Sequence, residues 1–327
     1  MKSDVNILIY AEGGFKLGLG NIYRSISLAD ALRKKGKKNI KFITSSTGYA
    51  SDVIYRNGYS LLSLKRNKLL DKIIELNPDI LITDFLGLSE NFAKKIKEKT
   101  KSKLVIIGNI SKANKYADIV INAIIGTNFK NKKHIENGTL YLEGPKYLVL
   151  GNEFIEKNRS YVHRGKLEKV LLLFGGTDQA NFTCKVLKDL LDYDKENKFV
   201  LVIGAGFKYE KELDKLIKKY SDSDISLHKN ASNVSELMLS SDFVITSAGT
   251  SLFEGFCLGI PTVGLFQNRS QKKVFRNFFM TMRYQDVDNI GKFINSIYSN
   301  ANKYNKGINL VKAGEGRWEI IDNILKL

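Results

Sequence analysis

Short apolar runs rich in β-branched residues alternate with longer helical patterns along most of the chain, and this alternation constrains the fold more than any other feature. In the segment 22–35 apolar residues recur at three- and four-residue spacing, which is typical of a helix that packs on a sheet. The expected strands of the first half are 5–10, 40–44, 80–83, 104–107 and 119–121. Strands separated by helices pair in parallel, so the sequence predicts the α/β class with a doubly wound sheet.

The alternation stops once and then restarts, which divides the 327 residues into two halves. The segment 153–167 is polar and charged, and new strand patterns follow at 170–174, 199–203, 243–246 and 262–266. We therefore expect an N-terminal domain over residues 1–152, a linker over 153–167 and a C-terminal domain over 168–327. Two doubly wound, Rossmann-like domains of this kind are expected to face each other across a cleft. The last helical pattern, 315–327, fits against either domain.

The net charge of +18 raises the question of an anionic partner. The lysines are scattered over helix surfaces and loop ends without interleaved aromatic residues, so nucleic acid is not expected. Weak contact with an acidic membrane surface stays open. No apolar run approaches the roughly 20 residues of a membrane span. Lys2 and Asp4 lead straight into the first strand pattern without a signal-peptide pattern, which predicts a cytoplasmic location.

The two cysteines, Cys184 and Cys257, lie far apart within helical patterns. Neither a disulfide framework nor a zinc site is therefore expected. Asp222 and Asp224 form a carboxylate pair, but they stand in a loop before a strand and are typical of turn residues. The sequence predicts no metal site.

Three turns that follow strands combine glycine with small hydroxyl residues, at 18–25, 175–183 and 247–254. Backbone N–H groups at such turns and at the helix starts beyond them are suited to phosphate. Glycine after a strand is also ordinary turn geometry, so the three turns together carry the argument rather than any one of them. We predict that they are ligand sites.

The sequences of these turns do not match two common nucleotide-binding motifs. A dinucleotide fingerprint requires a third glycine where Tyr23 stands and an acid after the second strand, where the run 44–46 has hydroxyl residues. A Walker-type loop requires a lysine and a hydroxyl residue after its last glycine, and no turn has them. Hydride transfer and ATP chemistry are therefore not expected.

The third turn is the most informative because it has a carboxylate one helical turn beyond its glycine. Ser247, Gly249 and Thr250 open a helix, and Glu254 follows them. A carboxylate beside a phosphate-binding turn can accept bonds from both hydroxyls of a ribose. Glu254 also fits a solvated helix residue that interacts with the helix dipole, and the sequence leaves both interpretations open.

Short motifs spread over nearly the whole chain carry a family resemblance. They are the first glycine turn with Arg24, Ser25, Leu28 and Ala29; Pro78, Asp79 and Asp84; Ala117, Asp118, Ile121 and Asn122; Gly144, Pro145, Tyr147, Leu150 and Phe154; Gly175, Gly176, Thr177, Asp178, Asn181 and Thr183; and the segment 247–261. With these motifs the chain resembles the nucleotide-sugar hydrolases of pseudaminic acid synthesis, the related spore-coat polysaccharide proteins and, more distantly, the lipid II glucosaminyltransferase. All of these have the two-domain glycosyltransferase-B (GT-B) fold.

The resemblance implies a site for uridine diphosphate (UDP) in the C-terminal domain and a sugar side in the N-terminal domain. It implies glutamate contact with the ribose through Glu254, and no metal or cofactor. The other substrate-binding residues that it implies are Gly175, Gly176, Thr177, Asp178, Ser247, Gly249 and Thr250 around the diphosphate, Ala231 within the segment 229–234 at the uracil, Gly18, Gly20 and Arg24 at the sugar, and Gln267 and Lys272 at the sugar, acceptor or phosphate.

One departure from the family pattern concerns the chemistry. The hydrolases have a histidine, their proposed water-activating base, where this chain has Asn21. An asparagine can orient a hydroxyl but cannot take a proton at neutral pH. The chain also has Gly108 and Asn109 where relatives often have paired aspartates, and it lacks an arginine near Gly151. We therefore expect UDP binding to be retained and the chemistry to be altered or lost.

Asp84 is the first choice for a substitute catalytic base, with Glu12 and Asp178 as alternatives. Asp84 also fits a carboxylate that caps the next helix. Three functions remain open. The chain either hydrolyses a UDP-sugar, transfers the sugar to a sugar or lipid-linked acceptor, or binds the nucleotide sugar as a non-catalytic scaffold.

Overall fold

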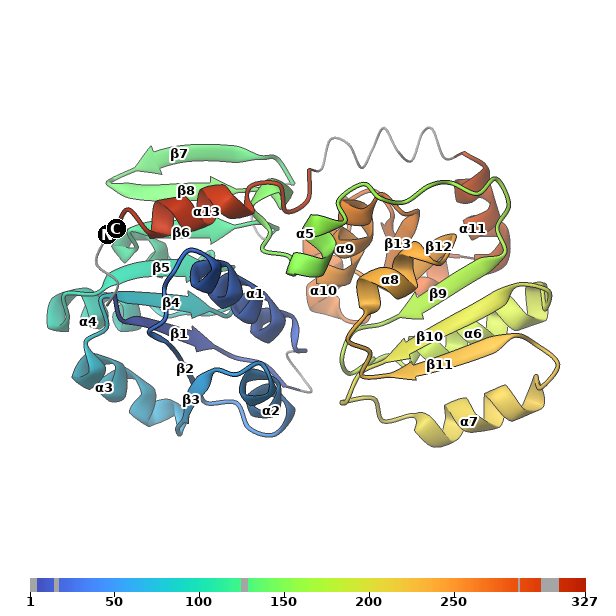
Figure 1. The fold of residues 1–327 in the computed structure, drawn as a ribbon, viewed down its shortest axis with the longest axis horizontal. Helices are drawn as coiled ribbons and strands as arrows, with labels where there is room; N and C mark the ends of the chain where they lie inside the picture. Colours follow the sequence, from blue (N-terminus) through green and yellow to red (C-terminus); the bar gives the residue numbers. More distant parts are fainter. Residues whose placement is uncertain (1–4, 15–17, 125–128, 288, 301–311) are drawn as a thin grey trace. The chain divides into compact units, whose positions relative to one another are not determined.

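The computed structural model describes residues 5–14, 18–124, 129–287, 289–300 and 312–327. It divides the chain into two compact units (Figure 1). Unit 1 comprises Met1–Gly151 with Ala313–Leu327, and unit 2 comprises Asn152–Lys312. The last helix, α13 (Arg317–Ile324), thus belongs to the first unit, which is one of the two placements that the sequence left open.

Among the described residues, unit 1 has an eight-stranded sheet in the order β3-β2-β1-β4-β5-β6-β8-β7. Every neighbouring pair is parallel except β8 with β7. The strands are β1 (Ile7–Ala11), β2 (Ile40–Thr44), β3 (Ser60–Ser63), β4 (Ile80–Asp84), β5 (Lys103–Ile107), β6 (Ile119–Asn122), β7 (Lys132–Glu136) and β8 (Thr139–Glu143). The helices are α1 (Gly20–Lys34), α2 (Tyr49–Arg56), α3 (Arg66–Leu76), α4 (Glu90–Lys99), η1 (Lys112–Tyr116) and η2 (Pro145–Tyr147).

Successive side chains along the strands of unit 1 point to opposite faces of the sheet, so each face has its own hydrophobic core. Ile7 and Ile9 of β1 pack with α1, α2 and α13, whereas Leu8 and Tyr10 pack with α3 and α4. Both sets are buried, as expected for a parallel sheet covered by helices on both faces. The fold thus holds the carboxyl ends of β1 and β4 side by side, which sets the place of the first glycine turn.

Unit 2 repeats the architecture with a parallel sheet in the order β11-β10-β9-β12-β13-β14. The strands are β9 (Lys169–Leu173), β10 (Lys198–Ile203), β11 (Ile225–Lys229), β12 (Phe243–Ser247), β13 (Thr262–Leu265) and β14 (Thr281–Met282). The helices are α5 (Asn152–Glu156), α6 (Phe182–Tyr193), α7 (Glu210–Lys219), α8 (Val234–Leu239), α9 (Thr250–Leu258), α10 (Arg269–Phe275), η3 (Tyr284–Asp286) and α11 (Ile290–Ser299). The predicted α/β class with two doubly wound sheets is confirmed.

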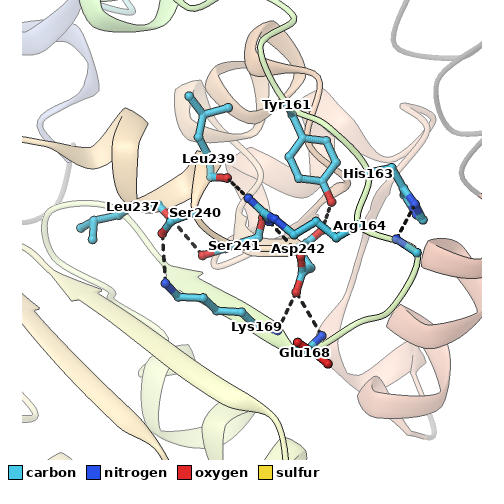
Figure 2. A network of polar contacts seen from close by, with 11 residues as sticks. Tyr161, His163, Arg164, Glu168, Lys169, Leu237, Leu239, Ser240, Ser241 and Asp242 are labelled. Carbon is cyan, nitrogen blue, oxygen red and sulfur yellow. Dashed lines mark hydrogen bonds and ion pairs between the residues drawn. The ribbon is translucent and has the colours of Figure 1, made fainter.

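The segment expected as a linker, 153–167, packs on unit 2 instead of crossing solvent (Figure 2). The Arg164 guanidinium donates to the Leu239 carbonyl (2.7 Å) at the end of α8 and forms an ion pair with Asp242 (2.8 Å). The other Asp242 oxygen accepts from the backbone N–H groups of Glu168 and Lys169, at 3.0 and 2.8 Å. Arg164 of this segment is therefore paired within unit 2, which the composition alone did not indicate.

Candidate functional site

The turns after β9 and β12 lie side by side, because these two strands are paired. Gly175 has a φ of +76°, a conformation that favours glycine, and the Ser247 hydroxyl oxygen lies 3.8 Å from the position of a Cβ on Gly175. Gly176 is packed against a further glycine, since a Cβ on Gly204 would lie 2.5 Å from the Gly176 Cα. The sequence-predicted turns at 175 and 247 are thus brought together by neighbouring strands.

The start of α9 is the second part of this site. Gly249 is its N-cap residue and has an extended backbone, and Thr250 is its first helical residue. Ser247 ends β12 and is 8% exposed. A helix N-terminus beside a glycine turn presents several N–H groups and a partial positive charge, which suits an anion such as a diphosphate.

Glu254 lies one turn into α9 and is partly exposed. Its burial raises the pKa of the carboxyl from 4.5 to about 7, a hydrogen bond from Ser251 opposes this rise, and the nearby charge of Glu153 adds to it. A partly exposed carboxyl with a pKa near 7 exists in both charged and protonated forms at neutral pH. A ligand that donates hydrogen bonds through its hydroxyls would favour the charged form.

The side-chain polar atoms of Gln267, which is partly exposed, and of the buried Asp178 are bonded to the protein backbone. The Gln267 amide donates to the Phe174 carbonyl (2.8 Å) and accepts from the Ala180 N–H (3.3 Å). Asp178 is 2% exposed and accepts from the N–H groups of Phe182 and Thr183, both at 2.8 Å, while burial raises the pKa of its carboxyl. Both side chains hold the 175–183 turn in place, so this conformation favours positioning over direct contact with substrate.

The remaining predicted residues of unit 2 lie around the same edge of its sheet. Thr177, in the turn after β9, is 7% exposed. Ala231 is partly exposed in the loop between β11 and α8, and Lys272 is exposed on α10, the helix that follows β13. The structure thus places these residues on loops and helices that follow parallel strands, where ligands bind in doubly wound sheets.

In unit 1 a charged cluster lies where β1 and β4 end. Gly18 has a φ of +75°, and Gly20 is the first residue of α1. Arg24 forms an ion pair with the buried Asp84 and donates through Nη2 to the Asn21 side-chain oxygen (2.9 Å). Among the described residues, Arg24 Nη1 has no hydrogen-bond partner, whereas Nε and Nη2 are held by Asp84 and Asn21.

The predicted alternative bases of unit 1 are engaged in hydrogen bonds. Asp84 is fully buried and accepts from Arg24 Nε (2.9 Å) and from the Ser25 hydroxyl (3.0 Å). Glu12 accepts from the hydroxyls of Ser45 (2.5 Å) and Ser46 (2.7 Å). This geometry favours Asp84 as the group that positions Arg24, and its catalytic role stays a prediction.

Sequence reasoning missed partners that lie far along the chain. Ser46 joins Glu12 to the Gly13 N–H (2.9 Å), and Glu153 acts on Glu254 from a separate helix. Nothing in the local sequence indicates either interaction, because each joins residues that lie far apart along the chain. Within the described parts of the chain no group of three or more His, Cys, Asp or Glu residues could hold a metal ion. None of the described helices has the length and apolarity that crossing a membrane requires.

No protein-family model matches the chain. A protein of Methanocaldococcus jannaschii, itself uncharacterised, is 38% identical over 333 residues, which cover 99% of this chain and 66% of that relative. This chain thus spans just under two thirds of the length of that relative. The spore coat polysaccharide biosynthesis protein SpsG of Bacillus subtilis is 26% identical over 282 residues, covering 84% of this chain and 81% of SpsG. The chain is thus similar in sequence to SpsG over most of the length of both proteins.

Solved structures agree on the fold. MurG of Acinetobacter baumannii has a TM-score of 0.63 at 12% identity, covering 98% of this chain and 99% of MurG. HepE of Anabaena, solved in complex with UDP, has a TM-score of 0.59 at 14% identity, covering 98% of this chain and 100% of HepE. The chain therefore has the two-domain GT-B fold, as the sequence resemblance implied.

Proposed function

We propose that this chain binds the UDP part of a nucleotide sugar on unit 2 and cleaves the bond between sugar and diphosphate in surface polysaccharide biosynthesis. The observation that carries the proposal is the pair of adjacent turns after β9 and β12, with Glu254 one helical turn beyond the second. Similarity to SpsG supports the biosynthetic context, and the fold shared with HepE, which was solved with UDP, supports the nucleotide.

Each part of UDP has a chemically matched partner in this proposal. The diphosphate meets the backbone N–H groups around Gly175 and at the start of α9. The ribose hydroxyls donate to Glu254, and the uracil contacts the backbone near Ala231. Lys272 on α10 supplies a positive charge for the phosphates.

Cleavage breaks the bond between the anomeric carbon of the sugar and its phosphate oxygen. The electron pair of that bond leaves with the UDP, so donors that stabilise negative charge on the diphosphate accelerate the step. The incoming oxygen comes from water in hydrolysis or from a hydroxyl group in transfer. Arg24, whose Nη1 edge has no partner among the described residues, is proposed to contact the sugar or the acceptor.

A second candidate function is a non-catalytic scaffold that binds a nucleotide sugar. It is favoured by the state of the three candidate bases, since the carboxylates of Glu12, Asp84 and Asp178 all accept hydrogen bonds from the protein. Asn21 cannot serve as a base in their place. Binding without turnover is the expected behaviour of this candidate.

The test is calorimetric UDP binding together with UDP release from a panel of UDP-sugars, with and without sugar and lipid-linked acceptors. Release in water supports hydrolysis, acceptor-dependent release supports transfer, and binding alone supports the scaffold. Glu254→Ala is expected to weaken UDP binding at least tenfold, whereas Glu196→Ala, at an exposed loop position in the same unit, is the matched control. Absence of UDP binding, or unchanged affinity in Glu254→Ala, contradicts the proposal.

A further inference from the structure

The short helix α5 holds the start of α8 through two oppositely charged side chains. The Glu153 carboxylate accepts from the Ser235 backbone N–H (3.1 Å). Lys157, just beyond α5, donates to the Ser235 hydroxyl (3.1 Å) and pairs with Glu236 (3.2 Å). Ser235 is fully buried, so its N–H group is satisfied by a protein acceptor and not by water. The first turn of α8 is therefore fixed by residues that precede unit 2's first strand in the sequence.

The same segment is tied to α9. The Cys257 thiol donates to the Phe154 carbonyl (3.4 Å), and the Arg159 N–H donates to the Cys257 carbonyl (2.8 Å). α5 thus contacts both helices that flank the proposed nucleotide site, with the loop before α8 at the base and α9 at the ribose and diphosphate. A group on α5 can act on both parts of the site at once.

We propose that Glu153 is a positioning residue of the nucleotide site, which fixes the base-binding loop through Ser235 and acts through its negative charge on the ribose-binding carboxylate of Glu254. This inference rests on the proposed UDP site. Glu153 was not among the residues that the sequence indicated, because it lies in the segment expected as a linker.

The charges around Glu254 make this effect specific. α9 packs against α5, α8, β12 and β13, and its Phe253 ring also lies against Phe275 of α10. The charged residues on these elements are the cations of α10 (Arg269, Lys272 and Lys273) and three glutamates, Glu153 and Glu156 on α5 and Glu236 on α8. Glu236 is paired with Lys157, and of the three only Glu153 raises the pKa of Glu254. Glu153 is therefore the charge whose removal shifts the titration of Glu254.

A ribose needs the charged form of Glu254, because a protonated carboxyl accepts fewer hydrogen bonds. With a pKa of about 7 for Glu254, affinity for a UDP-sugar rises with pH and is about tenfold weaker at pH 6 than at pH 8. UDP-glucose is the suitable probe, since UDP has a terminal phosphate that itself titrates near pH 6. The pH profile thus reports the Glu254 carboxyl and not the ligand.

The test is calorimetric binding of UDP-glucose to the full chain at pH 6, 7 and 8. Glu153→Gln retains an acceptor for the Ser235 N–H and loses the charge, so we expect tighter binding at pH 6 and affinity within about twofold of the unsubstituted chain at pH 8. Glu153→Ala loses the acceptor as well and is expected to bind more weakly at all three pH values. Glu156→Gln removes the same charge from the same helix and is expected to leave the profile unchanged.

A pH profile in Glu153→Gln that matches the unsubstituted chain overturns the inference. A ligand-free measurement separates this outcome from failure of the proposed function. In urea unfolding at pH 8, the stabilisation gained by Glu254→Gln is expected to be smaller in a Glu153→Gln background. If the two substitutions add without coupling, the inference fails whether or not UDP-glucose binds; if they couple and no UDP-glucose binds, the proposed function fails and the electrostatic role of Glu153 stands.

Discussion

Replacing Glu254 by glutamine is predicted to stabilise unit 2 at alkaline pH. Burial raises the pKa of this carboxyl from 4.5 to about 7, so the folded state holds the proton more tightly than the unfolded chain does. Above pH 7 the folded state has to keep the carboxylate charged in unfavourable surroundings. Below pH 4.5 the carboxyl is protonated in both states, and the difference disappears.

The magnitude follows from the same pKa. Each tenfold change in proton affinity corresponds to about 1.4 kcal/mol, so the charged carboxylate costs about 3 kcal/mol at pH 8 and under about 1 kcal/mol at pH 5. Glutamine has the same shape and keeps an acceptor for Ser251. Glu254→Gln is therefore expected to raise the free energy of unfolding by up to about 3 kcal/mol at pH 8, while it weakens UDP binding.

The assay is urea unfolding of the full chain at pH 8 and pH 5, followed by far-ultraviolet circular dichroism. The single tryptophan, Trp318, lies in unit 1, so its fluorescence does not report on unit 2. Glu319→Gln is a control of opposite sign, because hydrogen bonds from Lys133 and Lys146 lower the pKa of Glu319. Removal of the Glu319 charge is expected to lower the free energy of unfolding of unit 1 by at most about 1 kcal/mol at pH 8, and by less as the pH falls. A Glu254→Gln chain that is no more stable than the unsubstituted chain at pH 8 refutes the reasoning.

Three further predictions concern the glycine turns and the charged cluster. Asp84→Asn removes the charge of the fully buried carboxylate that pairs with the partly exposed Arg24 and is expected to lower the melting temperature; an unchanged melting temperature contradicts a stabilising role of this ion pair. Gly204→Ala places a methyl group 2.5 Å from the Gly176 Cα and is expected to weaken UDP binding at least tenfold with an unchanged circular dichroism spectrum, whereas normal affinity would separate this turn from the diphosphate. Asn21→His introduces an imidazole at the start of α1 and is expected to produce or increase UDP release from UDP-sugars in water; no change would show that the lack of a base at this position does not limit hydrolysis.

The fold class was accessible from the sequence because buried parallel strands are short apolar runs. Each of the nine strands expected from such runs corresponds to a strand of the structure. The five described strands that were missed are β3, β7, β8, β11 and β14, and no residue of β3, β7 or β11 is buried. β3 is Ser60–Ser63, with both serines exposed, and β11 and β7 lie at sheet edges where one side has no neighbour. At these positions the apolar pattern is weak, because little of the strand is buried.

The candidate site was accessible only in part. The turns around Gly175 and Ser247 and the helix after them were indicated by glycine and hydroxyl spacing, and the structure brings them together. The environment of the side chains was not accessible. Ligand contact by Gln267 and Asp178 stays a prediction, and the sequence did not indicate that their polar atoms are bonded to the backbone in and beside the 175–183 turn. Such bonds depend on loops that meet at a sheet edge, and one chain without its fold does not define them.

The sequence by itself determined the α/β class, the parallel sheets and the turns. The reason is that the spacing of apolar residues, the positions of glycine and the residues that begin helices are local properties of the sequence. Only the tertiary structure decided that residues 153–167 pack on unit 2 and α13 belongs to unit 1. It alone decided that Asp84 holds Arg24 and that Glu153 raises the pKa of Glu254. The physical reason is that burial and charge act through space, between residues that the sequence places far apart.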